Sequence, residues 1–164
     1  MRAAVLHDYR QPLRVEDVPQ PAPGPDEILV QVEVCGVCHS DVHVADGDWA
    51  SVRGRLKLPR ILGHEVVGRV VERGADVSSL ALRERVGVPW VHWSCGACDT
   101  CREGFEHLCP QRKVTGLSAP GGYAEFLPAK ASHAAKIPDG LQPSEAAPLL
   151  CAGVTAYRGL KKLS

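Results

Sequence analysis

Apolar and polar residues alternate in several short stretches of this chain, and the alternation predicts β-strands. Within residues 27–34, every second position is apolar: Ile28, Val30, Val32 and Val34. A period of two is expected of a strand with one buried face. Comparable stretches, the third of them rich in valine, predict strands at residues 1–8, 13–18, 61–74, 85–89 and 121–127. Four prolines among residues 19–25 predict an exposed turn, because proline cannot donate to a strand ladder.

Two regions depart from this alternation. Residues 90–112 show no periodicity and are expected to form a loop. Residues 144 to about 164 are rich in alanine and leucine and predict a helical segment that Pro148 or Gly153 interrupts. Many short strands joined by glycine- and proline-containing turns, with few helices, predict a mainly β, barrel-like domain.

The composition narrows the class of protein. A chain of 164 residues fits one domain, residues 1–164, and can bury a core without help from a metal. Its 19 basic and 19 acidic residues balance, so neither nucleic acid nor an anionic membrane is expected as a partner. Its apolar runs are short and no signal segment is visible, so a soluble cytoplasmic protein is expected. Seven cysteines, an odd number, favour metal thiolates over a disulfide framework.

Four of the cysteines lie in the unpatterned loop with the spacing C-x2-C-x2-C-x7-C: Cys95, Cys98, Cys101 and Cys109. Four thiolates close a tetrahedral zinc shell and leave no position for water or substrate. The spacing therefore predicts a structural zinc site that stabilises a lobe at residues 95–109. Disulfides fit these tight spacings poorly in a reducing compartment.

The other three cysteines are Cys35, Cys38 and Cys151, and His64 and Glu65 are further candidate metal ligands. The Cys-x-x-Cys spacing of Cys35 and Cys38 suggests a redox pair, half of a zinc site, or one ligand beside a bystander, and the local sequence does not decide among these. One histidine with two thiolates would form an open three-ligand shell, which supports catalysis at the fourth position.

The chain resembles the catalytic domain of the zinc-dependent medium-chain alcohol dehydrogenases over its whole length. The motifs that carry the resemblance are residues 36–41 (Gly-Val-Cys-His-Ser-Asp), 63–65 (Gly-His-Glu) followed by Gly68 and Gly74, the four-cysteine loop, 121–125 (Gly-Gly-Tyr-Ala-Glu) and 151–157 (Cys-Ala-Gly-Val-Thr-Ala-Tyr). The resemblance implies a GroES-like, partly open β-barrel with a zinc-stabilised loop lobe.

The resemblance also implies the members of the catalytic site. Cys38, His64 and Cys151 are the expected ligands of a catalytic zinc, with Glu65 as an inner or alternate carboxylate and Cys35 as a bystander thiol. Together with the four-cysteine site, this gives two zinc ions per chain.

Further roles around the zinc follow from the same resemblance. Ser40 is expected to hydrogen-bond the zinc-held oxygen and to pass its proton, by way of the cofactor ribose, to His43 as the terminal base. Asp41 is expected to orient His64, with helix capping as the rival role. Trp49 and Trp90 are expected to line the substrate pocket, with packing as the alternative. His92 and His107 are interpreted as surface or packing residues.

Two features depart from the family pattern. Arg83-Glu84 precedes Arg85-Val86 where the family usually has Gly-Asp, so a rearranged turn is expected. No G-x-G-x-x-G motif is present to bind a nicotinamide cofactor. We therefore expect a fragment, or an isolated domain, whose Rossmann domain is supplied in cis or in trans.

The predicted function is the oxidation of small alcohols to aldehydes or ketones with NAD in a full-length, homo-oligomeric form. The chain alone is expected to be inactive. One alternative is a stand-alone zinc-binding or interaction module without turnover. Another is a related zinc reductase that acts on a different carbonyl or polyol.

Overall fold

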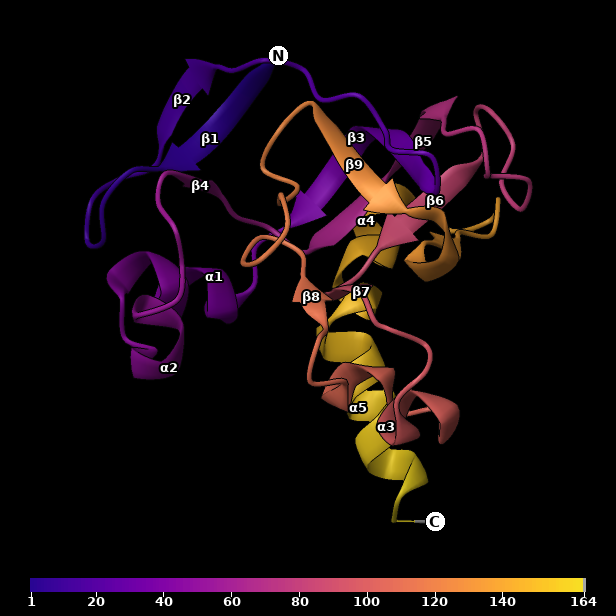
Figure 1. The fold of residues 1–164 in the computed structure, drawn as a ribbon. Helices are drawn as coiled ribbons and strands as arrows, with labels where there is room; N and C mark the ends of the chain where they lie inside the picture. The colour runs from indigo at the N-terminus through magenta and orange to yellow at the C-terminus, as the bar shows by residue number, and fades with distance from the viewer. Residues whose placement is uncertain (164) are drawn as a thin grey trace.

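The computed structural model describes residues 1–163 and shows three open antiparallel sheets with helices at their margins (Figure 1). No closed barrel is formed by these residues. Ser164, at the end of the predicted helical segment, lies outside the described residues. Within the described part of the chain, no helix is both long enough and apolar enough to cross a lipid bilayer.

The first sheet contains the two N-terminal strands that the alternation predicted. β1 (Arg2–Leu6) pairs antiparallel with β2 (Arg14–Asp17), and β4 (Arg60–Ile61) pairs with the other edge of β1. The proline-rich segment 19–25 contains no helix or strand, as predicted. This segment therefore connects the β1–β2 hairpin to the next strand without belonging to either.

The second sheet holds the main core. Its order is β10-β6-β5-β3-β9, and its strands are β3 (Glu27–Gly36), β5 (Glu65–Arg73), β6 (Arg85–Val88), β9 (Phe126–Lys130) and β10 (Ala135–Lys136). Ile28, Val30 and Val66 are fully buried between these strands, and each such side chain contributes about 1.5–3 kcal/mol. Leu29, which the alternation placed on the opposite face, is also buried, at 2% exposure.

The alternation predicted for β3 is interrupted between Val32 and Val34, where its pairing with β5 shifts register. Val30 and Val32 face the main core before the shift, whereas Cys35 packs against that core after it. Val34 packs instead with Val67 against the C-terminal helical segment. An extra residue in one strand reverses which side chains face the core. The predicted single buried face is therefore wrong beyond Val32, and it is also wrong at Leu29, which is buried on the opposite face.

The valine-rich stretch 61–74 forms two strands instead of one. β4 ends at Ile61 and β5 begins at Glu65, and Gly63 between them has a φ of 93°, which a residue with a side chain rarely adopts. The stretch 121–127 becomes a strand only at Phe126, because its start packs against the same break. There the Gly122 N–H donates to the Gly63 carbonyl at 2.9 Å.

The region 90–112 contains more regular structure than the predicted loop. β7 (Val91–Trp93) pairs with β8 (Lys113–Val114), and α3 (Asp99–Arg102) and the 3-10 helix η1 (Glu106–Leu108) lie between them. These elements are each four residues or shorter, so no hydrophobic period could reveal them.

Six further helices complete the fold of residues 1–163. They are α1 (His39–Asp46), α2 (Ala50–Arg53), η2 (Ala131–His133), α4 (Pro143–Ala146), η3 (Ala147–Leu150) and α5 (Ala152–Lys161). The predicted C-terminal helix is interrupted at Cys151, with φ −129° and ψ −81°, between the predicted positions Pro148 and Gly153. Beyond this break α5 runs past α3, away from the large sheet (Figure 1).

The turn before β6 forms without a glycine. Arg83 has a φ of 67°, so the absence of glycine does not remove the positive-φ turn, and the expected rearrangement is not seen. The Arg83 N–H donates to the Val70 carbonyl at 2.7 Å, and its carbonyl accepts from Arg69 Nη1 at 3.0 Å. These bonds offset a left-handed conformation that costs about 1–2 kcal/mol for a residue with a side chain.

Candidate metal centres and active-site cavity

Cys38 forms the junction between β3 and α1. It is the N-cap of α1, and its Sγ accepts from the Ser40 N–H at 3.5 Å. The Asp41 carboxylate accepts from the Cys38 N–H at 3.2 Å, which completes a capping box. The thiol is therefore held at a helix N-terminus, where partial positive charge favours a thiolate.

Donor atoms from three parts of the chain converge beside this thiol. Those of Cys38, His64, Glu65 and Cys151 all lie within 4.8 Å of one another. Cys38 Sγ and Cys151 Sγ are 3.8 Å apart, and both cysteines are free. Two thiolates on a tetrahedral zinc, each bonded at about 2.3 Å, are separated by about the same distance. The spacing fits a shared metal.

The environment of His64 gives a second test of that fit. Its side chain is 1% exposed, and its Nε2 has no hydrogen-bond partner among the described residues. Its Nδ1 lies 3.5 Å from Asp41 Oδ1. A buried polar atom without a partner is costly, and a metal ion would satisfy it. The residues present therefore fit a metal ion at Nε2, with a carboxylate behind the ring.

Asp41 caps α1 and also lies beside the His64 ring, so its position is compatible with both of the roles considered for it. Besides capping α1, its buried carboxylate accepts from the Gly63 N–H at 3.0 Å and from the Tyr123 hydroxyl at 3.0 Å. Burial raises the pKa of Asp41, but the contacts with His64 and these donors outweigh burial and hold the pKa below its usual value. The carboxylate stays ionised and ties the His64 segment to α1.

The thiols of this region differ in acidity. Burial raises the pKa of Cys35 to about 12 and that of Cys151 to about 12. Burial acts on Cys38 too, but hydrogen bonds from Ser40 outweigh it and lower the pKa of Cys38. Two adjacent sulfurs do not both ionise readily without a cation, so Cys38 carries the negative charge first. Cys35 is not a member of the donor cluster.

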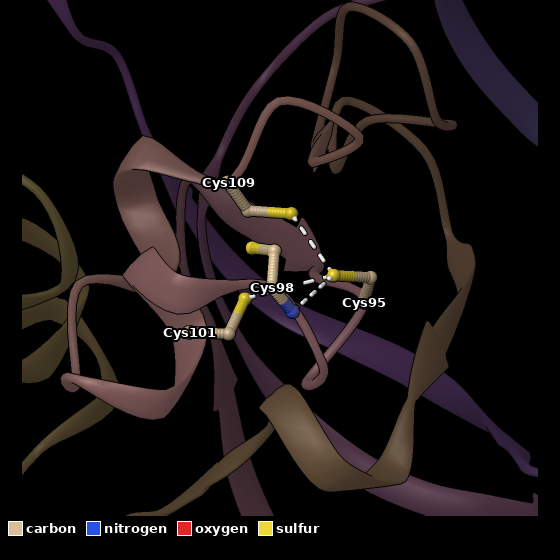
Figure 2. Close-up of side chains that lie close together, drawn as sticks. All are labelled: Cys95, Cys98, Cys101 and Cys109. Atoms are coloured by element: carbon tan, nitrogen blue, oxygen red, sulfur yellow. Dashed lines mark hydrogen bonds between the residues drawn. The ribbon is translucent and has the colours of Figure 1, made fainter.

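The four cysteines of the lobe form the second cluster. Their Sγ atoms point toward a common centre (Figure 2) and lie within 4.8 Å of one another: Cys95, Cys98, Cys101 and Cys109. Cys95 Sγ is 3.9 Å from Cys101 Sγ and 3.6 Å from Cys109 Sγ, close to the edge of a zinc tetrahedron and far from a disulfide bond of about 2 Å. A hydrogen bond with Thr100 lowers the pKa of Cys98 to about 6.

A cavity of about 420 Å³ borders the first cluster, and we call it the active-site cavity. Ser40, Trp49, Trp90 and Cys151 all line it. The Trp90 ring packs edge-on against the His64 ring, with centroids 4.7 Å apart, and edge-on against Trp49 at 6.3 Å. Three predicted site residues thus share one wall with a candidate metal ligand.

His43 does not line this cavity. Its side chain is 42% exposed, its Nδ1 lies 3.5 Å from an Asp48 carboxylate oxygen, and its ring stacks on His39 with centroids 4.6 Å apart. His43 follows Ser40 by one turn of α1 and therefore lies between the cavity wall and solvent.

Three side chains that no sequence motif marked also line the active-site cavity: His107, Arg112 and Arg158. They come together because α5 packs beside the lobe, where the Arg158 guanidinium lies 5.2 Å from the centre of the Phe105 ring. Neither the spacing nor the type of these three residues could have indicated that they line one cavity, since the lobe and α5 are far apart in the sequence.

Comparison with known sequences identifies relatives of the chain. A sequence model of the family described as "Alcohol dehydrogenase GroES-like domain" matches residues 24–139. The chain is 48% identical over 161 residues to an alcohol dehydrogenase of Geobacillus stearothermophilus, covering 98% of this chain and 47% of that protein. The chain thus spans about half the length of the curated relatives it matches.

Among solved structures, the chain is likewise similar to an alcohol dehydrogenase and to a reductase. The alcohol dehydrogenase of the archaeon Aeropyrum pernix is similar with a TM-score of 0.88 and 36% identity, covering 99% of this chain and 48% of that one. Acetophenone reductase from Geotrichum candidum, solved in complex with NAD, is similar with a TM-score of 0.86 and 34% identity, covering 98% of this chain and 47% of that one.

Proposed function

The chain belongs to the family of alcohol dehydrogenase GroES-like domains, and we propose that it is the catalytic domain of a zinc-dependent oxidoreductase. In its full-length form, this enzyme oxidises small alcohols to aldehydes or ketones with NAD. The observation that carries the proposal is the convergence of Cys38, His64, Glu65 and Cys151 beside the active-site cavity, which Cys151 lines.

Cys38, His64 and Cys151 hold the catalytic zinc in this proposal, and Glu65 is the inner or alternate carboxylate. The 3.8 Å spacing of the two sulfurs and the unpartnered Nε2 of His64 support the assignment. Three protein ligands would leave one position of a bound zinc open, where the Lewis acid could act on a substrate oxygen. Asp41 orients His64 through its other ring nitrogen.

Zinc at this site supplies a Lewis acid that makes a bound alcohol easier to deprotonate. Ser40 lies on the cavity wall beside Cys151, so its hydroxyl is placed to accept the alcohol proton. His43, one helical turn along α1, is the terminal base, and its half-exposed ring can release the proton to water. Trp49 and Trp90 form the apolar wall that favours the carbon chain of the substrate.

The second cluster, Cys95 to Cys109, holds a structural zinc, which makes two zinc ions per chain. Four thiolates leave no open position, so this ion would stabilise the lobe without entering the reaction. We propose a cytoplasmic location, because a reducing compartment keeps these thiols available for metal.

A nucleotide-binding domain, in cis or in trans, supplies the NAD that accepts the hydride. The relatives are about twice as long as this chain, and one structural relative was solved with NAD. α5 exposes an apolar stripe, with Val154 53%, Tyr157 61% and Leu160 69% exposed. Because this stripe continues from the active-site cavity through Val154, we propose that the nucleotide-binding domain covers it.

The first test measures zinc and alcohol oxidation in the purified full-length protein. Cys38→Ala is expected to remove one of two zinc equivalents and to lower the oxidation rate by roughly a thousandfold, because it removes a ligand of the Lewis acid. Cys35→Ala is the control and should keep both zinc ions, since Cys35 lies outside the cluster. Unchanged zinc content in Cys38→Ala would show that the ligand assignment is wrong.

A further inference from the structure

A second cavity, of about 640 Å³, adjoins the active-site cavity. The two cavities share three lining residues, Trp49, Trp90 and Arg112. Trp49 and Trp90 therefore lie between the metal centre and the second cavity. A substrate longer than a few carbons could extend from one cavity into the other.

All of the charged side chains that line the second cavity are positive. Its lining includes four cationic side chains, Arg55, Lys57, Arg60 and Arg112, and no aspartate or glutamate. Within residues 1–163, no carboxylate oxygen lies close enough to any of the four to form an ion pair. In a chain whose charges balance overall, such a group creates a local positive potential. We call this space the cationic cavity.

Arg60 is the member of this group that the fold holds most firmly. It lies in β4, whose backbone pairs with β1 opposite Leu6, so its Cα is fixed by a sheet. Its Nε is buried and has no hydrogen-bond partner among the described residues. Burial lowers the pKa of the Arg60 guanidinium, which reflects the loss of hydration of its charge. A partly buried guanidinium that has no carboxylate partner is stabilised when an anionic oxygen accepts from it.

We propose that the cationic cavity binds an oxyanion, the carboxylate or phosphate at the far end of the alcohol substrate. This inference rests on the proposed function, because it takes the substrate hydroxyl to lie at the Cys38–His64–Cys151 cluster. The substrate then has three parts: a hydroxyl at the metal centre, an apolar middle against Trp49 and Trp90, and an anionic end at Arg60. The planar guanidinium matches the two oxygens of either anion.

The first experiment measures binding without any turnover. Tryptophan fluorescence of the zinc-loaded full-length protein is titrated with butyrate, butyl phosphate and neutral butanol at constant ionic strength, since Trp49 and Trp90, two of the three tryptophans of residues 1–164, line the cavity. One or both anions should bind at least roughly tenfold more tightly than butanol, as expected for a charge-assisted hydrogen bond. Arg60→Gln should abolish that preference. Equal binding of all three ligands would overturn the inference.

The second experiment compares kcat/KM for ω-hydroxy carboxylates, hydroxyalkyl phosphates and n-alcohols of the same chain lengths. Arg60→Gln should lower kcat/KM roughly ten- to a hundredfold for the preferred anionic series and leave that for the n-alcohols unchanged. Lys57→Gln is a second variant in case Arg60→Gln fails to fold. Arg53→Gln is the matched control, because Arg53 packs over Tyr9 outside the cavity.

The outcomes separate the inference from the proposed function. If the wild-type protein oxidises n-alcohols but Arg60→Gln lowers all series equally, the inference fails and the proposed function stands. If the wild-type protein oxidises no alcohol, the proposed function fails, and the inferred substrate fails with it. If Arg60→Gln raises KM for NAD alone, the cations serve the cofactor and the inference is overturned.

Discussion

The two ring nitrogens of His64 lie in different environments, and this difference is what makes the residue suited to a metal. Nδ1 faces the ionised Asp41, whereas Nε2 is buried and has no hydrogen-bond partner within residues 1–163. In the proposed site, this carboxylate would fix which nitrogen carries the proton and leave the other free to coordinate the metal. The sequence placed His64 and Asp41 in separate motifs, and the break at Gly63 brings them together.

His92 is also a buried histidine, and its burial affects the stability of the protein. It is 5% exposed on β7, and burial lowers its pKa to about 4, with Lys130 adding to the effect and Glu27 opposing it. Its Nδ1 has no hydrogen-bond partner among residues 1–163. Of the two interpretations offered for His92, a surface residue or a packing residue, this burial favours packing.

The protein is expected to lose stability as the pH falls from about 6.5 to about 4, because unfolded His92 gains a proton there and the folded residue does not. The loss from this residue reaches about 3 kcal/mol below pH 4. His92→Phe should flatten the curve of unfolding free energy against pH in that window, measured by urea denaturation. The exposed His107→Phe is the control. Parallel curves for wild type and His92→Phe would contradict the prediction.

At the scale of elements, the candidate site is built from element ends. Cys38 caps α1, Glu65 begins β5, and Cys151 lies at the break between η3 and α5. Strand and helix ends carry unpaired backbone groups and irregular conformations, so they can aim side chains that regular segments cannot. The periodic patterns predicted many of the strands and helices, but the candidate metal ligands lie at the ends of these elements, where the periodic patterns end.

The lobe at 95–109 has little regular structure to hold it. Its helices α3 and η1 are four and three residues long, and only Cys101 and Cys109 among its residues are buried. Short helices are not stable alone, so we expect a metal ion at the four-cysteine cluster to be the internal support of the lobe.

Cys101→Ala is expected to open the lobe, because three ligands hold zinc less tightly than four. Limited digestion with trypsin should then cut at Arg102 roughly tenfold faster or more than in the wild type. One zinc equivalent should be lost in the same variant. Cys35→Ala, outside both clusters, is the control. An unchanged digestion pattern in Cys101→Ala would count against a structural metal.

At the scale of the whole molecule, the exposed apolar stripe on α5 is the clearest sign of a missing contact. Val154, Tyr157 and Leu160 are all more than half exposed on a helix that runs beyond the sheets (Figure 1). Isolated exposed apolar residues are common, but three on one helix beside a cavity indicate a covered surface. The family relatives have a second half that could supply that cover.

Leu160→Asp is expected to lower the stability of the full-length protein by about 1–3 kcal/mol, because it buries a charge where the second domain docks. Leu82→Asp is the matched control: Leu82 is 56% exposed in the turn before β6, and the change should shift stability by less than about 0.5 kcal/mol. Thermal unfolding measures both. Equal melting temperatures for the two variants would argue against docking at α5.

The sequence by itself determined much about this protein. Short alternating stretches predicted the strands at 1–8, 13–18, 27–34 and 85–89, and the structure confirms them within a few residues. The motifs gave the family and its GroES-like, mainly β fold class, which the comparisons confirm. These inferences succeed because a period of two and a fixed cysteine spacing are local properties that survive folding unchanged.

Only the tertiary structure decided how distant segments meet. It showed that a register shift turns Cys35 toward the main core and that the sulfurs of Cys38 and Cys151 lie 3.8 Å apart. It also showed that the buried Nε of Arg60 has no partner in the part of the chain that the structure describes. None of these follows from local pattern, since each depends on long-range pairing whose register and burial are set by the whole fold. The sequence specified which chemical groups are present, and packing decided which of them share one site.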